Sequence, residues 1–255
     1  MKIDGTPRIL SLTLFFVAAL SAIPGLSVAT QNEKSVGTQP LALRLDSLEG
    51  LQVQDFRENN LDPARVSVDI ATYRGRRALH LVNDDSVIAK GNPSGGQSLA
   101  IVKSSDFKDG TIEVDLVGMP RAGARPDTRG FVGLAFHVQD RGARFEAFYL
   151  RFTNGRADDQ LRRNHTAQYV SEPDYPWFRL RQENPGVYES YVDVEERAWT
   201  KLKVVVKGTQ ARLYVNGATQ PCLIVNDLKL GDIRGQVALW NGSDTESYFS
   251  NLRVE

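Results

Sequence analysis

The chain of 255 residues contains one cysteine, Cys222, so no disulfide bond can form within it. A metal site built from cysteines is excluded for the same reason, because such sites use several thiolates. Cys222 stands between Pro221 and Leu223, and this apolar context favours a small buried side chain over a reactive thiol. We therefore expect a hydrophobic core to supply the stability of the fold.

The sequence also lacks an excess of charge of either sign, with 31 Lys and Arg residues against 31 Asp and Glu residues. The first 29 residues hold two of the basic residues and one of the acidic ones, which leaves 29 and 30 in the rest of the chain. A balance near zero argues against nucleic acid or an anionic membrane as the main partner, because both select basic proteins.

Long apolar runs are absent except at the start, where Lys2 and Arg8 precede the apolar residues 9–23 and a Ser-Val-Ala sequence ends at Ala29. This order predicts a secretory signal peptide, residues 1–29, cleaved after Ala29. A membrane anchor is the weaker alternative, because a spanning helix needs about 20 apolar residues and Pro24-Gly25 interrupts this run. We expect a secreted or periplasmic protein with no membrane anchor after cleavage. Residues 30–40 are polar and aperiodic and predict a disordered leader.

No amphipathic helix longer than about two turns and no internal repeat is visible. Short strand-like runs separated by turn residues occur instead, at residues 41–45, 66–71, 78–82, 97–102, 111–117, 187–194, 200–206, 211–215, 236–240 and 248–254. About a dozen such runs in one chain predict an all-β fold, a β-sandwich or jelly roll of two antiparallel sheets. With no linker in residues 41–255, we expect one domain there.

Residues 130–151 predict the central antiparallel hairpin, with Asp140-Arg141-Gly142 as its turn. On this register Gly133 lies opposite Tyr149, and Ala135 lies opposite Ala147. One face is then an apolar layer made of Val132, Leu134, Phe136, Val138, Phe148, Leu150 and Phe152. The other face has small residues from which Tyr149, Arg151 and His137 project. We expect this face to form a solvent-filled groove, with room for a leucine at position 133.

Several short sequence segments resemble those of a known group of proteins. Residues 107–116 (FKDGTIEVDL) resemble the early strand of laminin-G-like domains, and residues 199–206 (WTKLKVVV) with 211–217 (ARLYVNG) resemble a later pair. Residues 235–240 (GQVALW) and 249–254 (FSNLRV) are similar to the last two strands. Together they resemble the concanavalin A-like lectin/glucanase superfamily. The nearest match is to bacterial exported domains of the 3-keto-disaccharide hydrolase or family 16-like glycoside hydrolase type. The resemblance implies two packed sheets with a ligand on the concave face.

The retaining-glucanase motif, Glu-x-Asp-x-x-Glu on one strand, is incomplete in this chain. Glu113 and Asp115 match its first two carboxylates, but Gly118 stands in the place of the third. Nothing in the motif then protonates the leaving oxygen, so the two-carboxylate mechanism fails. We interpret Glu113 and Asp115 as a solvated strand face.

Residues 151–191 interleave arginines, aromatics and carboxylates without strand periodicity. Such a segment is functional or disordered in most compact domains, and its aromatics argue against disorder. Sugar recognition uses this mixture, because aromatic faces stack on pyranose rings while planar polar groups bind hydroxyls. Our candidate sugar-binding residues are Tyr149, Arg151, Arg163, His165, Trp177 and Trp240. For Trp177 the alternative is a lid that closes the sandwich. For Trp240 the alternative is a packing residue under residues 153–185.

The candidates for catalysis are His137, as a base near neutral pH, and Glu189 as its partner. His80, His137 and His165 show no metal-ligand spacing, so no metal site is predicted from them. The resemblance leaves a structural calcium ion possible, with Asp46 and Asn251 as weak candidate ligands, and no other cofactor is expected. Three hypotheses remain open: a carbohydrate-binding domain, which leads, a glycoside hydrolase and a non-catalytic interaction sandwich.

Overall fold

The structure is a computed structural model that describes residues 41–43, 45–56, 66–83 and 96–255. All of them belong to one compact unit, Thr38–Glu255. The predicted signal peptide, residues 1–29, and the predicted leader, residues 30–40, lie outside the described residues. Among the described residues, no helix combines the length and the apolar character needed to cross a membrane.

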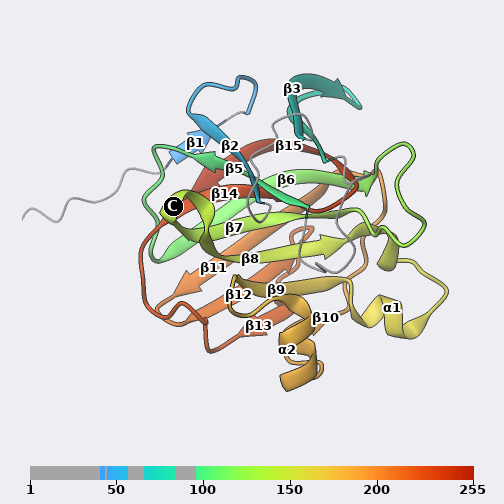
Figure 1. The fold of residues 1–255 in the computed structure, drawn as a ribbon, viewed down its shortest axis with the longest axis vertical. Helices are drawn as coiled ribbons and strands as arrows, with labels where there is room; N and C mark the ends of the chain where they lie inside the picture. Colours follow the sequence, from blue (N-terminus) through green and yellow to red (C-terminus); the bar gives the residue numbers. More distant parts are fainter. Residues whose placement is uncertain (1–40, 44, 57–65, 84–95) are drawn as a thin grey trace, which may run out of the picture. The chain divides into compact units, whose positions relative to one another are not determined.

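Within these residues the strands form two antiparallel sheets, as predicted (Figure 1). Sheet A has eight strands, and sheet B has seven. In spatial order, sheet A contains β13 (Leu223–Val225), β12 (Gln210–Val215), β11 (Thr200–Lys207), β6 (Gly110–Pro120), β15 (Thr245–Val254), β4 (Arg76–Asn83) and β3 (Val66–Tyr73), with β1 (Leu41–Leu43) also pairing with β15. Sheet B contains β10 (Glu189–Ser190), β9 (Ala167–Glu172), β8 (Arg144–Arg151), β7 (Phe131–Gln139), β14 (Gln236–Asn241), β5 (Gln97–Val102) and β2 (Leu51–Phe56).

The main hydrophobic core is formed by the inward-facing side chains of both sheets. β6 shows how alternation builds it: Ile112, Val114 and Leu116 are fully buried in the core, as the sequence predicts. On the outer face of this strand Asp115 contacts Arg76 and Lys201. Each large apolar side chain that is fully buried contributes about 1.5–3 kcal/mol, so a core of this size accounts for folding without disulfide bonds.

The β7–β8 hairpin has the predicted register, with Gly133 opposite Tyr149 and Ala135 opposite Ala147. The prediction fails at the end of β7, where the pairing shifts between Phe136 and Gln139. His137 has φ 52° there, a left-handed conformation that β-bulges use. The extra residue reverses the alternation, so Val138 leaves the core and joins the outer face of sheet B.

Residues 153–185 contain more regular structure than expected. Helix α1 (Gln160–Asn164) begins where the side chain of Asp159 accepts a hydrogen bond from the backbone of Arg162 (3.0 Å). Strand β9 follows, and helix α2 (Trp177–Glu183) begins after Pro176. α2 contacts β9 and α1 contacts β10, so both helices lie at the β9–β10 edge of sheet B (Figure 1). Strands β2, β9 and β13 were not predicted, and β10 covers only two of the residues predicted at 187–194.

Candidate functional site

The outer face of sheet B, turned away from the main core, carries a second apolar cluster. Its centre is the pair Tyr149 and Trp240, whose rings stack with their centroids 4.5 Å apart and their planes at 16°. The two residues are near neighbours because Trp240 pairs with Gly133, and Gly133 pairs with Tyr149. The same row of paired residues continues through Gln168 to Glu189. Sheet pairing therefore places the side chains of Trp240, Tyr149, Gln168 and Glu189 in one row across the sheet.

Tyr149 and Arg151 do not face solvent, and that expectation is wrong. Their exposed fractions are 3% and 5%, and that of Trp240 is 5%. The Tyr149 ring lies between Trp240 and the edge of Phe131, which leaves little of it accessible. The indole nitrogen of Trp240 donates to Gln97 Oε1 (2.9 Å). Burial raises the pKa of Tyr149 to about 12, so its hydroxyl keeps its proton at neutral pH.

The expected open space beside Gly133 is also missing. A Cβ atom at this position would lie 2.0 Å from the backbone oxygen of Phe148 and 2.6 Å from the Cα atom of Tyr149. Both contacts are with backbone, which cannot rotate away as a side chain can. Gly133 is therefore part of the packing and does not border a vacant groove.

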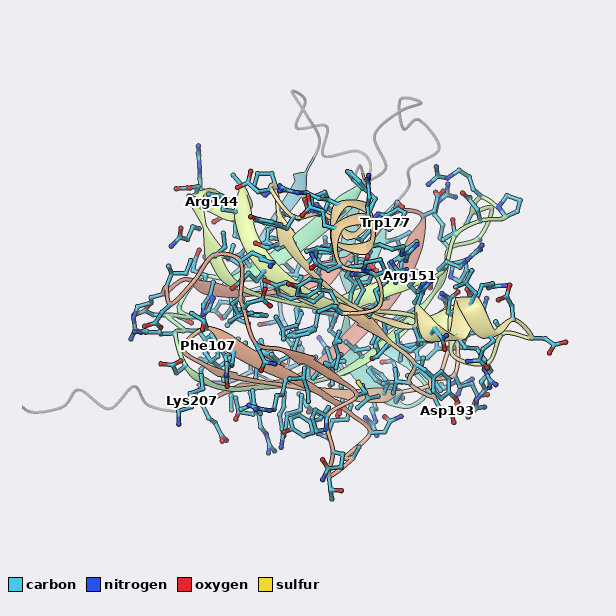
Figure 2. The ribbon with its side chains drawn as sticks, turned by 90° about the horizontal axis from the view of Figure 1, so that it is seen from below. Phe107, Arg144, Arg151, Trp177, Asp193 and Lys207 are labelled. Atoms are coloured by element: carbon cyan, nitrogen blue, oxygen red, sulfur yellow. The ribbon has the colours of Figure 1, made fainter. Side chains whose placement is uncertain are left out.

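Arg151 connects the stacked pair to the neighbouring strands. Its Nη2 donates to the hydroxyl of Tyr149 and to Oε1 of Gln168, both at 3.1 Å. Its Nη1 donates to the backbone oxygen of His165 at 2.8 Å and lies 3.5 Å from Oε1 of Glu189. This arrangement is a charge-assisted network with defined geometry. Figure 2 shows Arg151 and Trp177 near each other, and the guanidinium carbon lies 5.9 Å from the Trp177 ring centroid.

Glu189 is surrounded by positively charged and titratable groups. Its side chain is 3% exposed and forms two hydrogen bonds with Arg181, one of them from Nε at 2.9 Å. Nε2 of His165 lies 3.5 Å from Oε2 of Glu189. Arg181 also covers the Trp177 ring, with its guanidinium carbon 4.7 Å from the centroid. Burial lowers the pKa of His165, although the charge of Glu189 opposes this shift.

Five sequence-predicted residues thus lie in one network: Tyr149, Arg151, His165, Trp177 and Glu189. Arg163 lies apart from it, over the ring of Tyr191 at 5.3 Å. The partly exposed members of the network are Trp177, Arg181 and His165, and together we call them the rim. The stacked Tyr149 and Trp240 form the buried floor beneath.

His137, the first candidate for catalysis, is fully buried, and the expectation that it projects from the outer face beside Tyr149 is wrong. Its Nδ1 is bonded to Oε2 of Glu146 (2.8 Å), and its Nε2 to the backbone oxygen of Lys108 (2.9 Å). The β-bulge explains the difference, because alternation through a regular strand would have put His137 on the outer face. Both ring nitrogens are engaged inside the protein.

Glu172 is a further polar residue at this face that the sequence pattern does not reveal. It lies at the end of β9 on the same side as Gln168 and Val170, is 8% exposed and is hydrogen-bonded to the side chain of Gln97. Burial raises the pKa of its carboxyl group to about 7, while the bond to Gln97 opposes the shift. Alternation within β9 could have revealed this position if the strand had been predicted.

Glu172 predicts a pH-dependent stability. Its carboxyl group has a pKa of about 7 in the folded protein and 4.5 as the reference value. A raised pKa means that the folded state binds the proton more tightly, so the stabilisation is complete below pH 4.5 and is lost as the pH rises through 7. Relative to Glu172→Gln, the free energy of unfolding should fall by about 3 kcal/mol over this window. Urea unfolding at a series of pH values measures this free energy. If it depends on pH in the same way in both proteins, the raised pKa of Glu172 is contradicted.

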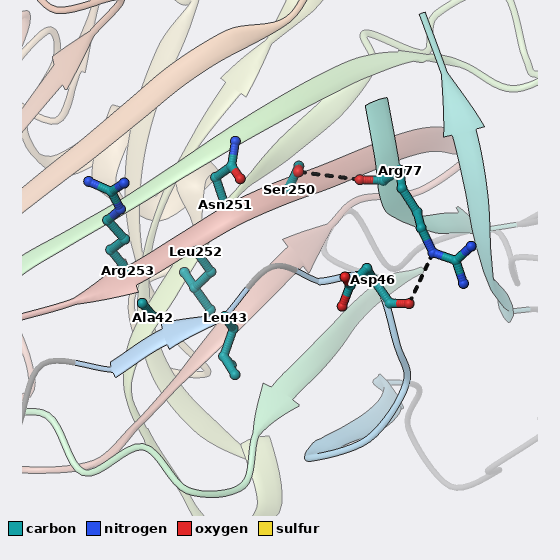
Figure 3. A pocket seen from close by; sticks show the side chains of 8 residues that line it. All are labelled: Ala42, Leu43, Asp46, Arg77, Ser250, Asn251, Leu252 and Arg253. Atoms are coloured by element: carbon teal, nitrogen blue, oxygen red, sulfur yellow. Dashed lines mark hydrogen bonds between the residues drawn. The ribbon is translucent and has the colours of Figure 1, made fainter. Parts of the chain in front are cut away.

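The two weak calcium candidates, Asp46 and Asn251, line one pocket of about 530 Å³ on sheet A (Figure 3). Arg77 and Arg253 line it too. The backbone oxygen of Asp46 accepts a bond from Arg77 (3.2 Å), and Asn251 donates to Asp115 (2.8 Å). Two guanidinium groups disfavour a divalent cation at this place. In the part of the chain that the structure describes, no group of three or more His, Cys, Asp or Glu residues could hold a metal ion. Calcium binding stays a prediction.

The fold is found among solved structures. A Bacillus subtilis protein of unknown function with a galectin-like fold matches with a TM-score of 0.53 and 11% identity, over 84% of this chain and 94% of that one. The carbohydrate-binding module CBM66 from Bacillus subtilis has a TM-score of 0.47 and 13% identity, over 74% and 92% of the two chains. A β-1,3-1,4-glucanase (lichenase) from a mouse hindgut metagenome has a TM-score of 0.49 and 12% identity, over 85% and 98%.

No protein-family model matches the sequence, and no curated protein matches it. At identities this low the structural similarity shows the fold alone. The chain has a galectin-like fold of two antiparallel sheets, which confirms the predicted β-sandwich.

Proposed function

We propose that this protein binds carbohydrate at the rim of sheet B, formed by Trp177, Arg181 and His165. The single observation that supports the proposal is the convergence of aromatic rings and planar hydrogen-bonding groups at that place. Arg181 lies over the Trp177 ring and Arg151 lies near it, while both contact Glu189. A pyranose would stack on accessible parts of Trp177 while neighbouring guanidinium and imidazole groups bind its hydroxyls.

The structure changes which tryptophan we favour as the sugar platform. Trp240 is 5% exposed and stacked on Tyr149, so too little of its ring is accessible for a sugar to stack on it. Trp177 is partly exposed and lies on the short helix α2 at the edge of the sheet. We therefore assign stacking to Trp177, and we assign to Tyr149 and Trp240 the support of the surface beneath it.

The residues at the start of the chain support the proposal that the protein is exported, secreted or periplasmic. The proposal rests on Lys2, Arg8, the apolar residues 9–23 and the small residues before Ala29. Polysaccharide outside the cell would then be the accessible ligand.

Trp177→Ala should weaken glycan binding, with little loss of stability. Losing one stacked ring should cost about 1 kcal/mol, or about fivefold in affinity. A glycan array, followed by titration calorimetry with the best ligand, measures the effect. Trp199→Ala is the matched control, because Trp199 is also partly buried but packs against Tyr73 beside sheet A. If both variants bind as the unmodified protein does, the rim is not the binding site.

A glycoside hydrolase at the same face is the second candidate, and Glu172 is the observation that favours it. A buried carboxyl group with a pKa of about 7 has the character of a general acid, and Glu189, which lies among arginines, pairs with Gln168 four residues along β9 from it. Glycosidases give two carboxylates different surroundings, so that one acts as the acid and the other as the base or nucleophile. In such an enzyme Glu172→Gln would abolish release of reducing sugar from the bound glycan and keep affinity. A catalytically unchanged variant would exclude this role.

A further inference from the structure

We propose that the saccharide bound at the rim is acidic, and that Arg129 and Arg162 bind its carboxylate or sulfate group. This inference rests on the proposed function, because it names the class of ligand for the same site. The two arginines, together with Arg151, form what we call the basic corner of sheet B.

The basic corner is assembled around Thr153, which follows β8. The backbone nitrogen of Thr153 donates to the backbone oxygen of Arg129 (3.1 Å). The guanidinium group of Arg162 donates to the backbone oxygen and hydroxyl of Thr153 (3.3 and 3.4 Å). Arg162 also reaches Asn154 (3.4 Å), and Asn154 donates to the same backbone oxygen of His165 that Arg151 binds. The corner is therefore continuous with the network beneath the rim.

Several other arginines pair with carboxylates that the structure describes, whereas Arg129 and Arg162 do not. Arg121 and Arg125 pair with Asp244, Arg156 pairs with Asp193 and Glu195, and Arg181 pairs with Glu189. Among the described residues, the guanidinium group of Arg129 donates only to the backbone oxygens of Pro126 and Thr128, both at 3.3 Å. Neither Arg129 nor Arg162 forms an ion pair with any described residue. Both are partly exposed, so a ligand can reach them.

The electrostatics of the corner favour an anion. Burial first, and then the positive charges of Arg162 and Arg151, lower the pKa of Arg129, while the charge of Asp127 opposes the shift. Asp159 is another carboxylate in this region, and one of its oxygens already accepts the backbone N–H of Arg162. Clustered guanidinium groups repel each other unless an anion lies between them, and their planar donors match the oxygens of carboxylate and sulfate.

The class of sugar follows from the groups that the basic corner and the rim would present to one ligand. A neutral sugar would satisfy Trp177 and His165 but would leave Arg129 and Arg162 without a counter-charge. A uronate or a sulfate ester on a ring next to the stacked one would supply it. The shared chemistry is thus an anionic substituent on a pyranose.

The test is an array that presents each oligosaccharide backbone in neutral, uronate and sulfate-ester forms. The unmodified protein should bind an acidic form about tenfold more tightly than its neutral counterpart, which is the effect expected of one charge-assisted contact. The double variant Arg129→Gln and Arg162→Gln should reduce this preference to about twofold or less while still binding the neutral backbone. The uronate and sulfate arms distinguish which anion is preferred.

The matched control is Arg234→Gln, which removes the same charge from an exposed position paired with Asp106. It should keep the full preference, and rising ionic strength should reduce the preference of the unmodified protein but not that of the double variant. The two single variants are measured as well. If the double variant fails to fold, the preference for the acidic form is compared between the single variants and the unmodified protein. Equal binding of neutral and acidic forms would overturn this inference and leave the proposed function intact. Binding of no glycan in any form would overturn both.

Discussion

Replacing Gly133 with alanine should lower the free energy of unfolding by about 3 kcal/mol or more, at the upper end of the range for overpacking. The new Cβ atom would be placed 2.0 Å from the backbone oxygen of Phe148, so β7 and β8 must separate for it to fit. Separation would disturb the stacking of Tyr149 on Trp240. For a domain of this size the melting temperature should fall by about 6–12 °C.

Gly217→Ala is the matched control for this measurement. Gly217 has φ +74°, and a Cβ atom there would meet no heavy atom within 4 Å. Its cost is conformational only, about 1 kcal/mol. Thermal unfolding followed by circular dichroism compares the two variants. If the melting temperature of Gly133→Ala equals or exceeds that of Gly217→Ala, the hairpin accommodates the Cβ atom without loss of stability.

Glu146→Ala should destabilise the protein by about 3–5 kcal/mol, the cost of breaking a buried pair by removing one partner. The carboxylate of Glu146 is fully buried and accepts hydrogen bonds from Tyr169 (2.6 Å) and the backbone of Leu230 (3.2 Å), and it is paired with His137 (2.8 Å). Removing it leaves these groups unsatisfied inside the core. The pKa of Tyr169, raised by burial and by the charge of Glu146, should fall toward its ordinary value in any folded fraction.

Glu195→Ala gives the comparison, because Glu195 is 59% exposed at its side chain and pairs with Arg156 at 2.8 Å. Exposed pairs contribute about 0–1 kcal/mol. Denaturant unfolding of both variants should therefore separate them by several kcal/mol. Equal destabilisation would mean that the Glu146 pair is no more important than a surface ion pair.

The fold could be predicted where apolar residues alternate cleanly. Residues 111–117 placed Ile112, Val114 and Leu116 in the core, and the hairpin register followed from the turn after β7. Alternation failed at His137, because a β-bulge depends on the backbone conformation of one residue and leaves no pattern in the sequence. It also missed β9, whose residues are buried on both faces, so no polar face reveals the strand.

Part of the candidate site could be predicted as well. The pattern indicated two residues on one face of a strand, Tyr149 and Arg151, and the aromatic and basic composition of the following segment indicated others. These residues do meet in the structure. Their burial could not be predicted, because it depends on a stacked partner, Trp240, that lies 91 positions later in the chain. Glu172 was missed because β9 was not predicted, and its environment includes Gln97 from a distant strand.

The position of β6 in sheet A has a consequence for the order of folding. Its two neighbours, β11 and β15, lie in the last quarter of the sequence, and β1 pairs only with the final residues of β15. Until those residues are synthesised, β6 has open hydrogen-bonding edges on both sides. Pairings this distant along the chain close large loops and form slowly. Nascent chains that end before β11 would therefore expose β6 to wrong partners, and a chaperone that holds the chain unfolded would protect it during this interval.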